Sequence, residues 1–134
     1  MDKIRENYPD KVKIVFRDFP LGFHSDAVPA AVAANCAGEQ DKYWEMHDLL
    51  MSNQRALDEA TLVSHANSLS LDMDKWATCR KDPAQTAEVQ KDQEDGAKVG
   101  VTGTPAFFVN GIMLSGALPY EQFETIIERE LAAK

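Results

Sequence analysis

The stretch from Val99 to Gly111, VGVTGTPAFFVNG, constrains the fold of this 134-residue chain more than any other part of the sequence. Proline cannot donate to a sheet ladder, so Pro105 is expected at the first residue of a strand or on an edge. The apolar run at 106–109 is separated from the run at 112–115 by Asn-Gly, which is the typical signature of a tight β-hairpin. Local sequence alone favours a trans bond before Pro105, because only about 5–6% of such bonds are cis in folded proteins.

The composition is that of one globular domain. Apolar residues make up 44% of the chain, and a chain of this size buries roughly two-thirds of its unfolded surface. No run of about 18 apolar residues occurs, so no membrane span is predicted. The N-terminal segment MDKIRENYPDKVK is charged throughout and lacks the apolar core of a signal peptide.

Charge and residue spacing exclude several classes of function. The net charge is −8, from 22 acidic and 14 basic residues, whereas nucleic-acid binding depends on clustered Lys and Arg. The three histidines are scattered, and no His or Cys cluster has the spacing of a metal site. The glycines of GVTGTP precede a strand, whereas phosphate-binding loops follow one. We therefore expect no metal, nucleotide or flavin cofactor.

The N-terminal quarter predicts a helix followed by a strand. Residues 2–8 have the character of a helix end, stopped by the turn at Pro9-Asp10. The segment 11–19, KVKIVFRDF, alternates and is rich in β-branched and aromatic residues. Because apolar side chains occur on both faces of this segment, it predicts a strand that is buried on two sides.

The centre of the chain predicts a block of helices. Two helices are expected between 25 and 53, the first capped by Ser25 and ended by Gly38. Further helices are expected to begin at the aspartates 58, 72 and 82, the last with Pro83 at its first position in a capping-box pattern. That helix is expected to reach about residue 99 and to bury a narrow stripe of Ala87, Val89 and Ala97.

The C-terminal segment predicts one more helix. It begins at Pro119, and its apolar residues recur at helical spacing along one face. These residues are Tyr120, Phe123, Ile126, Ile127 and Leu131.

Taken together, these motifs resemble the DsbA-like thiol–disulfide oxidoreductases of the thioredoxin superfamily. GVTGTPAFFVNG followed by GALPYEQFETII is similar to the C-terminal end of that family. The run VKIVFRDFPLGFHSDAVPAAVAANCAGEQDKYWEMHDLLMSNQ resembles its second strand and the start of its helical insertion. The resemblance covers essentially the whole chain, with several separate motifs in the family's order.

The resemblance implies an α/β, thioredoxin-like fold: a single domain over 1–134 with a helical insertion at about 25–99. It makes Pro105 the cis-proline of the family. It also implies substrate binding by Gly103, Thr104 and Pro105, because the backbone of the residue before that proline pairs with extended substrate. A rigid loop of this kind exposes backbone groups to a strand-like peptide at little entropic cost.

The chain departs from the family pattern at its start. The family has a first strand and then Cys-x-x-Cys at a helix N-terminus, where the thiolate is stabilised. The segment DKIRENYPDKVKIVF matches the end of that helix, so no catalytic cysteine pair is expected here. Cys36 and Cys79 lie in predicted helices of the insertion, where they form either a structural disulfide or two buried free thiols.

A missing first strand leaves two apolar strands without a central partner. The two strands close up on each other, or a second copy supplies the pairing, or the segment lies outside this chain. Of these we expect association between chains, as a homodimer.

Three functions are compatible with the sequence. The first is a protein disulfide oxidoreductase that acts on thiol-containing proteins and is inactive as this chain. The second is a redox-inactive module that binds extended peptides, and the third is a glutathione-binding isomerase or transferase relative. The resemblance implies a periplasmic or other extracytoplasmic location, whereas a chain that is the complete gene product would be cytoplasmic.

Overall fold

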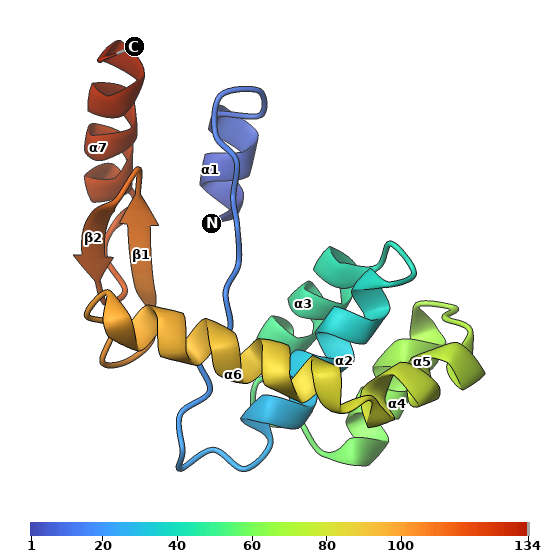
Figure 1. Ribbon diagram of the computed structural model, residues 1–134. Coiled ribbons are helices and arrows are strands. Elements are labelled where there is room, and N and C mark those ends of the chain that lie inside the picture. The colour runs from blue at the N-terminus through green and yellow to red at the C-terminus, as the bar shows by residue number, and fades with distance from the viewer. Residues whose placement is uncertain (134) are drawn as a thin grey trace. The chain divides into compact units, whose positions relative to one another are not determined.

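The computed structural model describes residues 1–133 (Figure 1). The elements follow one another as α1 (Asp2–Asn7), α2 (Ala27–Gly38), α3 (Tyr43–Ser52), α4 (Glu59–Ser68), α5 (Met73–Lys81), α6 (Pro83–Lys98), β1 (Ala106–Val109), β2 (Ile112–Ser115) and α7 (Tyr120–Ala132). The chain divides into two compact units. We call residues 17–96 the helical unit, and residues 1–16 together with 97 to the C-terminus the hairpin unit.

The helical unit has a continuous apolar core built around α2. This helix is rich in alanine, and small side chains let neighbouring helices pack closely against it. Gly38 closes the helix, and a methyl group there would meet Tyr43 Cβ of α3 at 3.3 Å. The buried residues of this core are Ala30, Val32, Ala33, Ala34, Cys36, Ala37, Met46, Leu50, Leu62, Ala66, Leu71, Trp76 and Val89.

Two of the predicted aspartate caps are confirmed. The Asp58 carboxylate accepts a hydrogen bond from the Thr61 N–H, and the Asp72 carboxylate accepts one from the Lys75 N–H. Both bonds satisfy amide groups that a helix N-terminus leaves without a partner. The start of α6 at Pro83 is also as predicted, and the Ala84 N–H donates to the Asp82 carboxylate at 2.9 Å.

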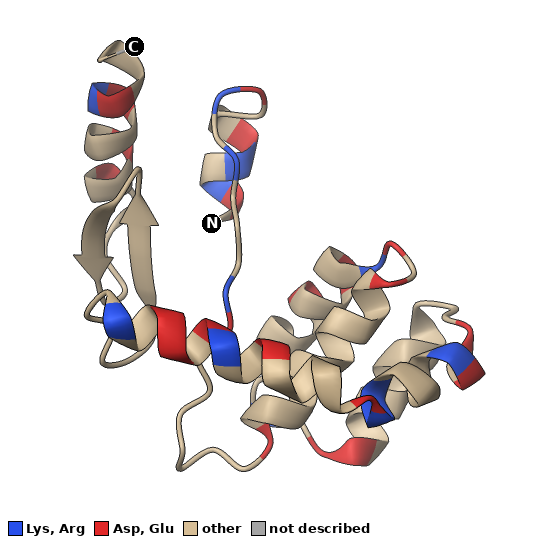
Figure 2. Ribbon diagram, in the orientation of Figure 1, with Lys and Arg blue, Asp and Glu red and all other residues tan. Residues whose placement is uncertain are grey.

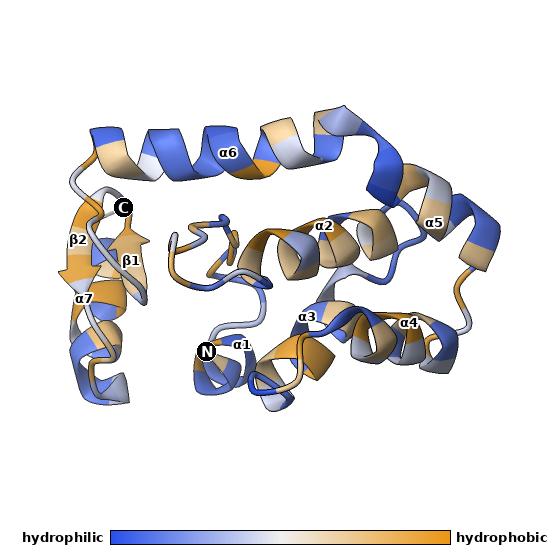
Figure 3. Cartoon of the chain, turned by 90° about the horizontal axis from the view of Figure 1, so that it is seen from below, coloured by the Kyte–Doolittle hydropathy of each residue, from blue (hydrophilic) through white to orange (hydrophobic). Residues whose placement is uncertain are grey.

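Three details of the helix predictions were wrong. Asp26, not Ser25, occupies the cap position of α2, and its side chain makes no capping hydrogen bond. On α6, Val89 is buried as expected, but Ala87 and Ala97 are exposed. Most of α6 is hydrophilic, as its blue ribbon shows in Figure 3, so a single buried valine is the main apolar anchor of this helix.

The hairpin unit combines a two-stranded antiparallel sheet with α1 and α7. Val109 pairs with Ile112 across the turn, where Asn110 and Gly111 both have positive φ, of 48° and 87°. These values are those of the type I′ turn that Asn-Gly favours, so the hairpin prediction is confirmed. Apolar side chains of the sheet pack on Phe123 and Ile127 of α7 and on Ile4 of α1.

The predicted strand at 11–19 is wrong. Residues 13–20 form no helix or strand, and the Val15 side chain is 65% exposed although we expected it to be buried. A strand needs a neighbour for its backbone N–H and C=O groups, and the ladder that the described residues contain joins only β1 and β2. The sequence of this segment has strand propensity, but propensity does not supply a partner.

Among residues 1–133, no helix combines the length and the apolar character needed to cross a lipid bilayer.

Candidate functional site

The loop that leads into β1 brings the three predicted binding residues to the surface. Val101 anchors the start of the loop in the interior, Gly103 is half-buried, and Thr104 and Pro105 are exposed. The peptide bond between Thr104 and Pro105 is cis. Pro105 leads directly into β1, which begins at Ala106.

The hydrogen-bond pattern defines which edge of β1 is unpaired. The Gly116 N–H donates to the Pro105 carbonyl at 2.9 Å, which places Pro105 in a bonded position opposite the second strand. Residues of an antiparallel pair alternate between bonding inward and facing outward, so Ala106 and Phe108 present their N–H and C=O groups to the opposite edge. The backbone of Thr104 likewise has no hydrogen-bond partner among the described residues.

The two faces of the hairpin differ in exposure. Phe107 points towards α7 and packs edge-to-face on Phe123, with ring centroids 4.8 Å apart. On the other face, Phe108 and its cross-strand partner Met113 are 43% and 38% exposed. Neither strand carries a charged residue, as the tan ribbons of Figure 2 show. The loop and the unpaired edge of β1 therefore border an uncharged apolar surface.

Gly103 is not required by backbone geometry at its position. Its φ lies outside the left-handed region, and no atom lies within 4 Å of the place that a Cβ would occupy. The open space beside Gly103 leaves the neighbouring Thr104 accessible.

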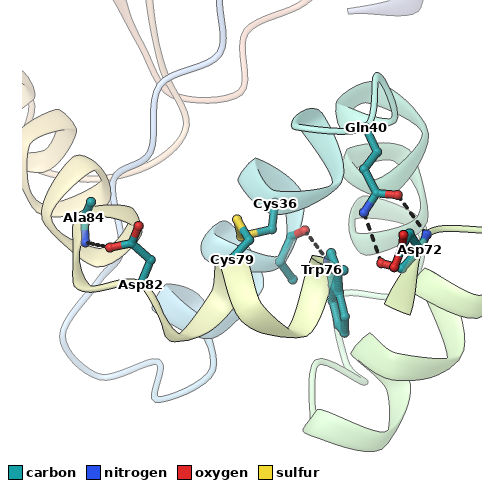
Figure 4. The surroundings of a disulfide bond; sticks show 8 residues. Cys36, Gln40, Asp72, Trp76, Cys79, Asp82 and Ala84 are labelled. Carbon is teal, nitrogen blue, oxygen red and sulfur yellow. Dashed lines mark hydrogen bonds between the residues drawn. A yellow bond between two sulfur atoms is a disulfide. The ribbon is translucent and has the colours of Figure 1, made fainter. Parts of the chain in front are cut away.

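The two cysteines lie in the helical unit and are joined to each other (Figure 4). Cys36 on α2 and Cys79 on α5 form a disulfide with Cα atoms 5.8 Å apart. Beside it, the Trp76 indole N–H donates to the Ala33 carbonyl at 3.1 Å. Gln40 bonds the backbone of Asp72 in both directions, so the end of α2 is tied to the start of α5.

Neither cysteine is available as a thiol. The chain contains two cysteines, and both are in this disulfide. Across residues 1–133, no group of three or more His, Cys, Asp or Glu side chains is placed to hold a metal ion. The arrangement around Thr104 therefore offers backbone hydrogen bonds and apolar surface to a ligand.

A family model described as Thioredoxin matches residues 1–129. The chain belongs to this thioredoxin family, in its DsbA-like branch. A thioredoxin-like oxidoreductase from Silicibacter pomeroyi shares the fold with a TM-score of 0.88 and 26% identity, over 99% of this chain and 76% of that one. Proteus mirabilis ScsC matches with a TM-score of 0.83 and 27% identity, over 98% of this chain and 72% of that one. The fold also matches that of the thiol-disulfide exchange protein α-DsbA2 of Wolbachia pipientis. The TM-score is 0.84 and the identity 20%, over 96% of this chain and 71% of that one.

Curated relatives of this DsbA-like domain are longer proteins. A protein of Salinispora arenicola named Na(+)/H(+) antiporter NhaA 1 is 35% identical over 96% of this chain and 20% of its own length. A protein of Salinispora tropica named Na(+)/H(+) antiporter NhaA 3 is 41% identical over 75% of this chain and 16% of its own. The DsbA-like chain thus spans about a fifth of the length of these relatives.

The domain also contains a polar cluster that the sequence did not reveal. The Asp18 N–H donates to the Asp92 carboxylate at 3.0 Å, although the two residues are far apart in the chain. Burial, and then the neighbouring Asp92 carboxylate, raise the pKa of Asp18 to about 6. Burial and the charge of Asp18 also raise the pKa of Tyr43. No local spacing signals such a cluster, because it forms only when residues 17–20 pack on α6.

Proposed function

We propose that this chain is the peptide-docking part of a DsbA-like protein disulfide oxidoreductase, and that these 134 residues alone do not catalyse thiol–disulfide exchange. The proposal rests on the backbone of Thr104, which is exposed and unpaired beside the apolar surface of β1. An extended peptide laid against Thr104 would gain main-chain hydrogen bonds, as in strand addition to a sheet edge. Membership of the DsbA-like family supports this role for Gly103, Thr104 and Pro105.

Peptide binding tests the docking role directly. The probe is a fluorescein-labelled peptide of alternating Val and Thr residues with Lys at both ends, and the readout is fluorescence anisotropy. We expect Thr104→Pro, which removes the backbone N–H, to weaken binding roughly tenfold, since one such hydrogen bond contributes on the order of 1 kcal/mol. The matched variant Thr104→Ala keeps the N–H and is expected to bind as the unmodified chain does. Equal losses in both variants would contradict backbone docking.

An insulin-reduction assay separates the docking role from catalysis. Both cysteines are held in the Cys36–Cys79 disulfide, and a transferable disulfide needs a thiolate at an accessible position. The expected result is turnover at the background rate, with or without substitution of both cysteines by serine. Turnover clearly above background would assign redox activity to this chain and overturn its description as a docking part alone.

The redox-inactive peptide-binding module is the second candidate, and the same two assays address it. It predicts peptide affinity that survives replacement of both cysteines by serine. It also predicts that extending the chain with the segment that precedes residue 1 in a longer relative leaves insulin turnover at background. A glutathione-binding relative would need a nucleophilic Ser or Cys near the first helix, and both cysteines of this chain are held in the disulfide instead.

We propose an extracytoplasmic location for the domain. Its disulfide supports this, because disulfides persist in oxidising compartments and are rare in the cytosol of most bacteria. Trapping free thiols with a maleimide reagent, after expression with and without export to the periplasm, tests the location. We expect the disulfide to be complete only in the exported protein, and full oxidation in the cytosol would remove this support.

The unpaired edge of β1 supports a homodimer as a further proposal. Ala106 and Phe108 direct backbone groups outward there, and the exposed Phe108 and Met113 add apolar surface. Open strand edges of this kind tend to pair with another chain. Light scattering over a range of concentrations tests it, and a strict monomer at high concentration would sink the proposal.

A further inference from the structure

The chain enters and leaves the helical unit at two points that lie close together. The chain enters at Arg17 and leaves near Gly96, close to the end of α6. Just inside these points, the entry segment is tied to α6 by hydrogen bonds. The Asp18 N–H donates to Asp92, and the Gln93 side chain donates to the Pro20 carbonyl at 2.7 Å.

Ion pairs reinforce this tie. The Arg17 guanidinium pairs with Asp92 and with Asp95, the latter at 3.1 Å between Nη2 and Oδ2. Asp95 also pairs with Lys91, one turn earlier on α6. Asp92 is the central acceptor, because one of its oxygens faces Arg17 and the other accepts the Asp18 N–H. Its side chain is only 17% exposed, so these bonds are partly protected from water.

The Asp18 carboxylate itself lies close to other negative charges. It lies near the carboxylates of Asp92 and Glu88 on α6, while Asn35 of α2 and His47 of α3 act in the opposite sense. The charge of Asp18 also acts on Tyr43 of α3, whose pKa it raises. Above pH 6, the ionised Asp18 therefore repels the same carboxylate that accepts its own backbone N–H.

We propose that Arg17, Asp18 and Asp92 form a proton-sensitive clasp that holds together the two connections of the helical unit. Protonation of Asp18 removes the cost of burying its charge and its repulsion of Asp92, and so tightens the clasp. Because the pKa of Asp18 is raised above its ordinary value, this stabilisation is fully present below about pH 4 and is lost as the pH rises through about 6. The clasp is thus tighter in an acidic medium than in a neutral one.

Backbone amide exchange measured by NMR on the full chain tests the clasp. The Asp18 amide reports it directly, because its N–H donates to Asp92. After correction for the intrinsic pH dependence of exchange, we expect its protection factor to fall roughly tenfold between about pH 5 and pH 7. This factor is what the rise in the pKa of Asp18 gives over these two pH units.

Variants separate the clasp from a general effect of pH. Asp18→Asn mimics the protonated form and is expected to abolish the fall in protection. Glu88→Gln removes one facing charge from an exposed position. It is expected to move the fall to lower pH and to make it smaller, because without Glu88 the pKa of Asp18 is raised less. Glu94→Gln, at an exposed position of the same helix, is the matched control and should keep the behaviour of the unmodified chain.

Two results would overturn the proposal. One is an Asp18 amide whose corrected protection does not change between the two pH values. The other is the same tenfold fall in Asp18→Asn as in the unmodified chain. If Asp18→Asn fails to fold, an unchanged size of the fall in Glu88→Gln overturns the proposal instead.

Discussion

The two units of this domain differ in how completely they bury their apolar residues. The helical unit encloses thirteen buried residues in one cluster, including a fully enclosed tryptophan and a half-cystine. The hairpin unit has a cluster of four, Ile4, Tyr8, Phe123 and Ile127, with the strands only half-buried against it. The helical unit therefore has the features of a self-sufficient core, and the hairpin unit does not.

The difference follows from the kind of hydrogen bonding in each unit. Helices satisfy their backbone groups within one segment, so the helical unit needs only apolar contacts and caps. A strand depends on neighbours, and a two-stranded hairpin alone is marginally stable in water. In the hairpin unit, α1 and α7 help, with the Tyr8 hydroxyl donating to Glu128 at 2.7 Å. Each of the following predictions tests this contrast.

The largest effect is expected from truncating the central tryptophan of the helical unit. Trp76 is 1% exposed, bonds the Ala33 carbonyl and stacks on the Arg80 guanidinium at 4.3 Å. Trp76→Ala is expected to cost about 3–5 kcal/mol of unfolding free energy, because it leaves a cavity and removes a buried hydrogen bond. Urea unfolding followed by circular dichroism measures this.

The matched variant in the other unit is Phe123→Ala, which removes the buried aromatic of α7. If the units differ as described, Phe123→Ala lowers the stability of the hairpin unit and leaves the amides of α2 and α5 protected from exchange. Trp76→Ala should reduce the protection of the amides of α2 and α5. Equal loss of protection in both units from Phe123→Ala would mean that they unfold as one, and the contrast would fail.

The next effect concerns the disulfide. Replacing Cys36 and Cys79 together by serine is expected to lower the free energy of unfolding by about 3–4 kcal/mol. The disulfide closes a long loop and so restricts the unfolded chain, and the double variant loses this restriction. The loss should appear in the helical unit only. The control is the unmodified chain under a reducing agent, which should show a loss of similar size. A double variant as stable as the oxidised chain would show that the helices alone suffice.

The same contrast explains what could be predicted from the sequence. The helix boundaries at Gly38, Asp58 and Asp72 followed from local signals, because caps and helical periodicity act within a few residues. The Asn-Gly turn is also local, and it correctly located the hairpin. These elements needed no knowledge of distant parts of the chain.

Features that depend on distant residues were not predictable. The segment 11–19 has the pattern of a strand, but no pattern reveals whether a neighbour is present to pair with it. The tie between Asp18 and Asp92 joins residues with no common motif. The sequence left the pairing of Cys36 and Cys79 open, because it depends on which faces of α2 and α5 meet. The loop at Thr104 could be located by its motif, whereas its exposed, unpaired backbone could not.

A smaller effect is expected at the cap of α5. The Lys75 N–H donates to the Asp72 carboxylate at 3.1 Å and lowers the pKa of this group. Asp72→Ala is expected to reduce the Tm by about 2–4 °C at neutral pH. Because the pKa is lowered, the stabilisation is present above the ordinary carboxylate value of about 3.9 and is lost as the pH falls through the lowered pKa. Asp74→Ala, in the same turn but not at the cap position, is the control.

The smallest effect on stability, and the sharpest test of the hairpin unit, is expected at its exposed face. Phe108 and Met113 face each other across the strands with more than a third of each side chain exposed. Replacing both by threonine keeps strand propensity and is expected to change the unfolding free energy by less than about 1 kcal/mol. If this face makes the hairpin unit prone to association, the double variant should scatter less light at high concentration and bind less of a hydrophobic dye. The matched change Met51→Thr, at an exposed apolar position of the helical unit, should alter neither signal. Unchanged association in the hairpin variant would mean that another surface causes the association. The open edge of β1 would then be tested with Ala106→Pro.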